Sequence, residues 1–139
     1  MKRPRALLVD DMPEILRYCS GLLSSDCEIV GTAASGSAAI QAVANMHPDL
    51  IVLDISMPGL NGIEVAKRLR REGCKAVIVF LSADDELSTA AIEAGGSAYV
   101  SKRLADSHLR KAITEAMAGR QYVAVSADST NRGDKPGNS

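Results

Sequence analysis

The sequence has 139 residues, which fits one domain with a real hydrophobic core and leaves little room for a second. Its formal net charge of -1 provides no overall attraction to nucleic acid or to a membrane surface. The first apolar run is too short for a signal sequence or a membrane span. Cys19, Cys27 and Cys74 lack the spacing of a disulfide framework or a zinc site. We therefore expect a cytoplasmic protein.

Five apolar runs alternate along the chain with five segments of helical periodicity. The apolar runs are 6–9, 28–31, 50–53, 76–81 and 98–100. Several are continuous, which is typical of strands buried on both faces. The helical segments are 12–24, 37–46, 62–71, 85–94 and 104–118. This alternation predicts an α/β fold, in which helices cover both faces of a parallel sheet.

The sequence predicts two regions of different character. Residues 1–125 contain all the apolar runs and helical segments, and we expect them to form one domain. From residue 126 to residue 139 the chain is polar and almost free of apolar side chains. Such a composition cannot bury enough surface to offset the entropy of ordering, so a disordered tail is predicted there.

Polar side chains follow most of the predicted strands. In open parallel sheets, ligands bind beyond the carboxyl ends of the strands. These ends are followed by Asp10 and Asp11, by Asp54, by Ser82 and by Lys102. Carboxylates that meet at one edge repel each other, and Mg²⁺ removes this repulsion while preferring oxygen ligands. The group lacks histidine and thiolate, which favours such a hard cation over zinc.

This set of side chains suits phosphoryl transfer. A carboxylate held at a metal ion can attack phosphorus and form an acyl phosphate. The reaction needs mainly positioning and neutralisation of charge on the phosphoryl oxygens. Mg²⁺ would neutralise one oxygen, the Ser82 hydroxyl a second and the Lys102 ammonium a third, with Asp54 as the nucleophile.

Four motifs resemble the response regulator receiver domain of two-component systems. They are Asp10-Asp11, the segment 54–62 (DISMPGLNG), Ser82-Ala83, and the segment 99–102 (YVSK). The resemblance covers residues 5–123. It implies a flavodoxin-like (βα)5 three-layer sandwich, with the parallel strands in the order 2-1-3-4-5.

The resemblance also implies how the site works. A sensor histidine kinase or a phosphotransfer protein would phosphorylate Asp54, with Asp10, Asp11, Asp54 and the backbone carbonyl of Ser56 around Mg²⁺. Apart from accepting this group and slowly losing it, the chain is not expected to be an enzyme.

The implied switch involves two further contacts. Ser82 and Lys102 would contact the phosphoryl group, and Tyr99 would rotate as Ser82 is drawn inward. The surface of the fourth helix, fifth strand and fifth helix would then change shape for a downstream protein or for a second copy of the chain.

Segments 28–40 and 118–123 resemble the NarL/FixJ subfamily. Those regulators normally continue into a DNA-binding helix-turn-helix, whereas this sequence continues into the polar tail. We therefore expect no DNA binding by this chain alone, and a truncated regulator of that type is one alternative. Two departures from the family stand out: the interval between Ser82 and Lys102 is shorter than usual, and Arg103 replaces a frequent proline that makes a cis bond.

Other interpretations remain open at this point. Asp10 and Asp11 could be solvated residues at a helix start, Ser82 a helix cap, and Tyr99 ordinary strand packing. Among functions, the alternatives are an unphosphorylated adaptor or dimerisation module and an enzyme of the haloacid dehalogenase type. The latter family has Asp-x-Asp after the first strand and a cap insertion, both of which this sequence lacks. A dinucleotide-binding domain would need glycines after Val9.

The remaining polar side chains predict surface positions. His47 and His108 have no carboxylate or cysteine partner nearby in the sequence, and are interpreted as structural or surface residues. Arg68, Arg70 and Arg71 are predicted to form a solvated helix face.

Overall fold

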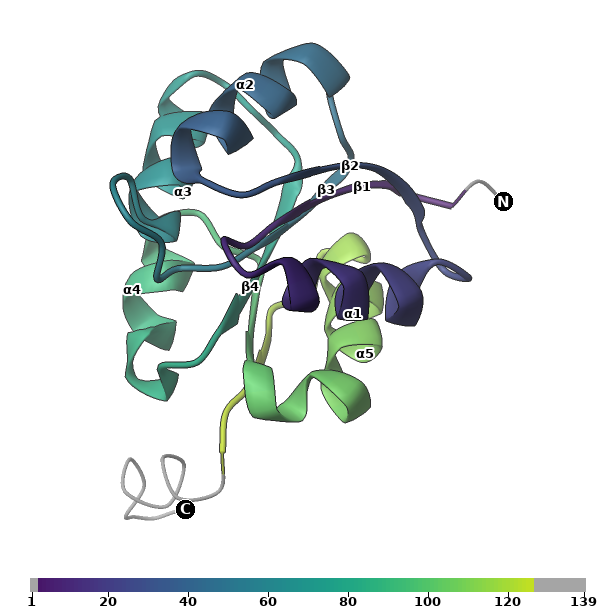
Figure 1. The fold of residues 1–139 in the computed structure, drawn as a ribbon. Coiled ribbons are helices and arrows are strands. Elements are labelled where there is room, and N and C mark those ends of the chain that lie inside the picture. The colour runs from purple at the N-terminus through teal and green to yellow at the C-terminus, as the bar shows by residue number, and fades with distance from the viewer. Residues whose placement is uncertain (1–2, 127–139) are drawn as a thin grey trace.

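The predicted apolar runs form neighbouring strands of one parallel sheet in the computed structural model, which describes residues 3–126 (Figure 1). The strands are β1 (Arg5–Val9), β2 (Glu28–Ala33), β3 (Leu50–Leu53), β4 (Val77–Ser82), β5 (Ala98–Ser101) and β6 (Tyr122–Ala124). Their order is β2-β1-β3-β4-β5-β6, and every pair is parallel. The predicted order of the first five strands is confirmed.

The sixth strand corrects the five-stranded prediction. Strand β6 pairs with β5 from Tyr122 opposite Ala98 to Ala124 opposite Val100, in a segment where the sequence predicted no strand. The Tyr122 hydroxyl lies 2.8 Å from Nδ1 of His108, which ties β6 to the helix that follows β5. Three residues are too few for a periodicity argument, so the strand depends on the neighbouring edge of β5.

Five α-helices connect the strands. They are α1 (Pro13–Leu23), α2 (Gly36–Met46), α3 (Gly62–Arg71), α4 (Ser88–Glu93) and α5 (Ala105–Met117). Short 3₁₀ turns precede the last two, η1 (Asp85–Leu87) and η2 (Lys102–Leu104), so the helix predicted from residue 85 begins with a tighter turn. The Ser35 hydroxyl caps α2 by accepting a bond from the Ala38 amide at 3.1 Å.

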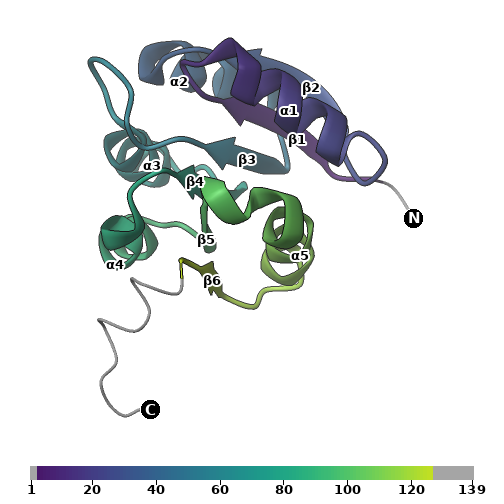
Figure 2. The same cartoon turned by 60° about the horizontal axis from the view of Figure 1, so that its bottom comes forward.

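The helices form two outer layers, as expected for a flavodoxin-like sandwich. Figure 2 shows α1 and α5 on one face of the sheet, and α2, α3 and α4 on the other. On the first face Leu8 and Val52 pack with Cys19 and Leu109. On the second face Ile51 and Phe80 pack with helical residues such as Leu69. Because both faces are covered, the polar end of the sheet is the natural place for a ligand.

Arg68 and Arg71 of α3 are exposed, as predicted for a solvated helix face, but the prediction is wrong for Arg70. Its guanidinium donates to the Gly95 carbonyl at 2.7 Å from Nη2, and to the Cys74 and Ala76 carbonyls at 2.9 and 2.8 Å from Nη1. These carbonyls lie in the turns before β4 and β5. A guanidinium fixes several donors in one plane, which suits such a set of acceptors. Arg70 therefore holds together two loops at the end of the sheet opposite the predicted site.

None of the helices in the described part of the chain is both long enough and apolar enough to cross a membrane. Of the predicted polar tail, only Ser126 belongs to the described residues.

Candidate functional site

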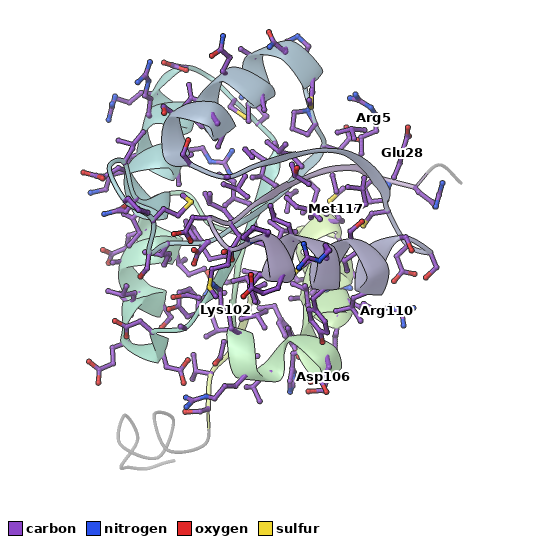
Figure 3. All side chains as sticks on the ribbon, in the orientation of Figure 1. Arg5, Glu28, Lys102, Asp106, Arg110 and Met117 are labelled. Atoms are coloured by element: carbon purple, nitrogen blue, oxygen red, sulfur yellow. The ribbon has the colours of Figure 1, made fainter. Side chains whose placement is uncertain are left out.

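Three of the predicted site residues meet at the carboxyl end of the sheet. Asp10 follows β1 and Asp54 follows β3, and these strands are direct neighbours with Val9 opposite Leu53. Lys102 follows β5, and Figure 3 shows it near the start of α1. Its Nζ lies 2.9 Å from Oδ2 of Asp10 and 3.3 Å from Oδ1 of Asp54. The ammonium thus bridges two carboxylates from separate strands.

Burial changes the electrostatics of this group. The side chain of Asp54 is only 2% exposed. Its burial raises the pKa to about 6, against the lowering effect of Lys102, and the nearby carboxylates of Asp10 and Asp11 raise it further. Burial alone would lower the pKa of Lys102, but its bonds to Asp10 and Asp54 outweigh this and raise it. Lys102 is therefore charged at neutral pH, while Asp54 changes between its protonated and ionised forms at a pH of about 6.

The three carboxylates fit a hard divalent cation. One oxygen from each of Asp10, Asp11 and Asp54 lies within 4.8 Å of the other two. Within residues 3–126, the buried Oδ2 of Asp54 has no hydrogen-bond or ion-pair partner. An oxygen-only donor set with a buried acceptor lacking a donor matches the preference of Mg²⁺. Ser56, whose carbonyl was the fourth predicted ligand, lies exposed in the loop after Asp54.

Local backbone packing holds the acceptor loop in place. Oδ1 of Asp10 accepts a bond from the Met12 amide at 2.9 Å, which orients the carboxylate at the start of α1. At the other side, α3 begins at Gly62, whose amide donates to the Ile55 carbonyl at 2.9 Å. A side chain at Gly62 would collide with the Asp54 carbonyl oxygen and approach the Ile55 Cα to 2.8 Å. The glycine in the 54–62 motif thus lets α3 start directly against Asp54.

A Gly62→Ala variant is expected to lower the free energy of unfolding by about 1–3 kcal/mol, because rigid backbone atoms must move to make room. Chemical denaturation monitored by circular dichroism measures this. The matched control is Gly21→Ala in α1, where an added methyl group meets no atom within 4 Å. Alanine should there stabilise the helix by about 0.5–1 kcal/mol. Equal effects of the two substitutions would show that the close approach at Gly62 carries no energetic weight.

Ser82 and Tyr99 form a second contact beside the carboxylates. Ser82 is the last residue of β4. Its Oγ accepts a hydrogen bond from the Asp84 amide at 3.1 Å, so Ser82 stabilises the following turn and does not cap α4. Tyr99 is fully buried in β5, and its hydroxyl donates to the Asp84 carbonyl. Burial raises the pKa of Tyr99, partly offset by hydrogen bonding with Ser82. The two predicted switch residues therefore meet at one turn of the β4–α4 loop.

Sequence reasoning missed one charged residue near the site. Asp85 follows this turn, and its side chain is only 4% exposed. Its Oδ2 accepts bonds from Nη2 of Arg103 at 3.1 Å and from the Ser126 amide at 3.0 Å. In the sequence, Asp85 stands in an acidic run before a helix, a pattern that normally indicates solvated side chains. Its partners are 18 and 41 residues away, so no local signal could have identified them.

The structure shows the conformation of the chain at both departures from the family pattern, Arg103 and the short interval between Ser82 and Lys102. Within residues 3–126 every peptide bond is trans, including the bond before Arg103. In the shortened interval between Ser82 and Lys102, the helix α4 has only six residues. The segment after β5 is a 3₁₀ turn, and Arg103 reaches back from it to the β4–α4 loop.

Comparisons with known proteins agree on one family. The sequence profile described as "Response regulator receiver domain" matches residues 6–114. The chain is 43% identical over 104 residues to a protein-glutamate methylesterase/protein-glutamine glutaminase of Nocardioides sp., covering 70% of this chain and 28% of that protein. It is 34% identical over 122 residues to the nitrate/nitrite response regulator protein NarL of Escherichia coli K12, covering 85% and 56%.

A solved structure gives the same result. The two-component response regulator of the LuxR family from Aurantimonas sp. superposes with a TM-score of 0.84 at 29% identity, over 96% of this chain and 100% of that one. The chain thus spans between about a quarter and just over half of the two curated relatives named above.

Proposed function

Because the chain belongs to the response regulator receiver domain family, we propose that it accepts a phosphoryl group on Asp54 in a Mg²⁺-dependent reaction. The observation that carries this proposal is the group formed by Asp10, Asp54 and Lys102, with an ammonium bridging two buried carboxylates. An adaptor that is never phosphorylated would not need this costly arrangement, since moving charged groups out of water is unfavourable even when they are paired. The burial of Asp10, which is 2% exposed, argues against a solvated residue at that position, whereas Asp11 is not buried.

In the proposed reaction, an oxygen of Asp54 attacks the phosphorus atom of the donor. A new P–O bond forms while the bond from phosphorus to the leaving group breaks, and the leaving group keeps the electron pair and takes a proton from solvent. The buried Oδ2 of Asp54 is the better candidate for attack, because Oδ1 lies against Lys102. The Asp54 carboxyl must be ionised for this step.

Lys102 and Ser82 would stabilise the transferred group. Lys102 moves its charge from the carboxylates toward a phosphoryl oxygen, and the Ser82 hydroxyl gives up its turn contact with Asp84 to donate to another. Asp10, Asp11, Asp54 and the Ser56 carbonyl would hold Mg²⁺, which when bound would neutralise the remaining negative charge. These roles give each polar side chain at this end of the sheet one task.

The proposed movement of Ser82 would also change the protein surface, through its effect on Tyr99. Its turn contact with Asp84 lies beside the Tyr99 hydroxyl, so drawing Ser82 toward the phosphoryl group removes one of the contacts around Tyr99. A protein target or a second copy of the chain that binds the surface of α4, β5 and α5 would then bind with a different affinity. The phosphoryl donor is a sensor histidine kinase or a phosphotransfer protein, as for other receiver domains.

The direct test is chemical labelling of the wild-type protein. Incubation with acetyl phosphate and Mg²⁺ should add the mass of one phosphoryl group, and hydroxylamine should remove it, because an acyl phosphate is labile to this nucleophile. Borohydride reduction followed by peptide mass mapping should place the modification at Asp54. Chelation of Mg²⁺ should prevent labelling. No labelling, or a stable adduct on a hydroxyl side chain, would contradict the proposal.

A further inference from the structure

Asp85 is a buried carboxylate outside the cluster of Asp10, Asp11 and Asp54. It lies in the 3₁₀ turn η1, where its side chain is 4% exposed. Burial alone would raise its pKa, but hydrogen bonds from Ser126 and Arg103 outweigh this and lower it. Asp85 is therefore an ionised group at neutral pH, held by donors from the chain segments beyond β5 and β6.

One of these donors directly follows Lys102 in the chain. Arg103 lies in the 3₁₀ turn η2, and its Nη2 lies 3.1 Å from Oδ2 of Asp85. This ion pair restrains the backbone immediately after Lys102, so it limits the point from which the lysine side chain starts.

The position of this starting point matters because a lysine side chain is long and flexible. Its Nζ must reach Asp10 at 2.9 Å and Asp54 at 3.3 Å, across two neighbouring strands from β5. Four rotatable bonds give the ammonium a wide range of positions, and the backbone limits that range. A shift of the Ser101–Arg103 segment would therefore move the ammonium away from the acceptor.

We propose that Asp85 is a positioning residue for phosphoryl acceptance, because its ion pair with Arg103 restrains the segment that carries Lys102 and thereby sets the reach of the ammonium. This inference rests on the proposed function of Asp54 and Lys102. Asp85 does not touch the reacting atoms, and it acts through Arg103. The Ser126 amide, which donates to the same oxygen at 3.0 Å, also ties the end of the described chain to Asp85.

The test compares Asp85→Asn, Arg103→Ala and the double variant. Asparagine keeps the shape of Asp85 and an acceptor for the Ser126 amide, but loses the charge that holds Arg103. Arg103 is 69% exposed, so its truncation should not disturb folding. With acetyl phosphate at saturating Mg²⁺, each single variant should take up the phosphoryl group about tenfold more slowly, since a misplacement of about 1 Å can cost up to about 10²-fold. The double variant should be no slower than the slower single variant.

A second measurement separates positioning from a general loss of structure. A less confined Lys102 competes less for Asp10 and Asp54, so the dissociation constant for Mg²⁺ alone, by calorimetry, should stay equal or fall. Backbone ¹⁵N relaxation should show increased motion at residues 101–104. The control is Asp26→Ala, which removes an ion pair with Arg110 at the surface and should leave all three readouts unchanged.

Two results would overturn the proposal: a wild-type rate of phosphoryl uptake in Asp85→Asn, or a loss of Mg²⁺ affinity in parallel with the rate. Failure of the proposed function has a different signature. The wild-type protein itself would then take up no phosphoryl group, while the relaxation at residues 101–104 in Asp85→Asn would still decide whether Asp85 holds the Lys102 segment.

Discussion

An Asp54→Asn variant is expected to take up no phosphoryl group and yet to unfold with a higher free energy than the wild-type protein at pH 7. The first result follows because an amide cannot attack phosphorus as a carboxylate does. The second follows from the raised pKa of Asp54, about 6 in the folded protein. Its ordinary value is 3.8, so ionising this group costs more in the folded protein than in the unfolded chain.

The sign and range of the stability effect can be stated in advance. The folded protein binds the Asp54 proton more tightly, so the stability from the neutral form is fully present below pH 3.8 and is lost as the pH rises through about 6. At about 1.4 kcal/mol for each step of one in pKa, the full loss is roughly 3 kcal/mol. The variant should recover about 1–3 kcal/mol of this at pH 7, because the pKa of about 6 already includes the favourable ion pair with Lys102.

Urea denaturation at pH 4, 5, 6 and 7 without divalent cations measures this effect. The wild-type free energy of unfolding should fall over this range relative to that of Asp54→Asn, and the two should converge at the acid end. Asp49→Asn serves as a control, because Asp49 lies before β3 at the opposite end of the same strand. A variant that is less stable than the wild-type protein at pH 7 would mean that the Lys102 ion pair outweighs the burial of the charge.

Replacing Lys102 by methionine should separate phosphoryl transfer from metal binding. We expect uptake from acetyl phosphate to slow by about 10²–10³-fold, the usual cost of removing one group that stabilises transition-state charge. Mg²⁺ should bind about tenfold more tightly, because a unit charge a few ångströms from a divalent ion costs roughly 2 kcal/mol even in a water-like medium. The reason is that the ammonium now lies against the same carboxylates that would hold the ion.

Calorimetric titration with Mg²⁺ and a time course of labelling give the two measurements. Lys111→Met is the matched control, since Lys111 is exposed on α5 and should change neither result. Weaker Mg²⁺ binding in Lys102→Met would show that the lysine organises the carboxylates more than it competes for them. An unchanged rate of labelling would remove Lys102 from the reaction.

The regular parts of this fold were predictable because their signals are local. Continuous apolar runs identified the first five strands, and polar residues directly after them identified Asp10, Asp54 and Lys102 as neighbours. The remaining features depend on contacts between distant segments. Arg70 on α3 bonds to carbonyls before β4 and β5, and Asp85 bonds to Arg103 and Ser126. In the sequence these residues have the same surroundings as solvated side chains.

The extra strand β6 replaces β5 as the edge strand of the sheet, so it determines which main-chain groups are free to pair with another chain at this edge. Since β6 pairs along β5, the main-chain groups of β5 are engaged on both sides, by β4 and by β6. A peptide that added a strand at this edge of the sheet would have to join at Tyr122–Ala124, where Val123 is 44% exposed. Recognition of β5 itself by strand addition would first require displacement of β6, so binding there should respond to changes in the short segment that carries Tyr122.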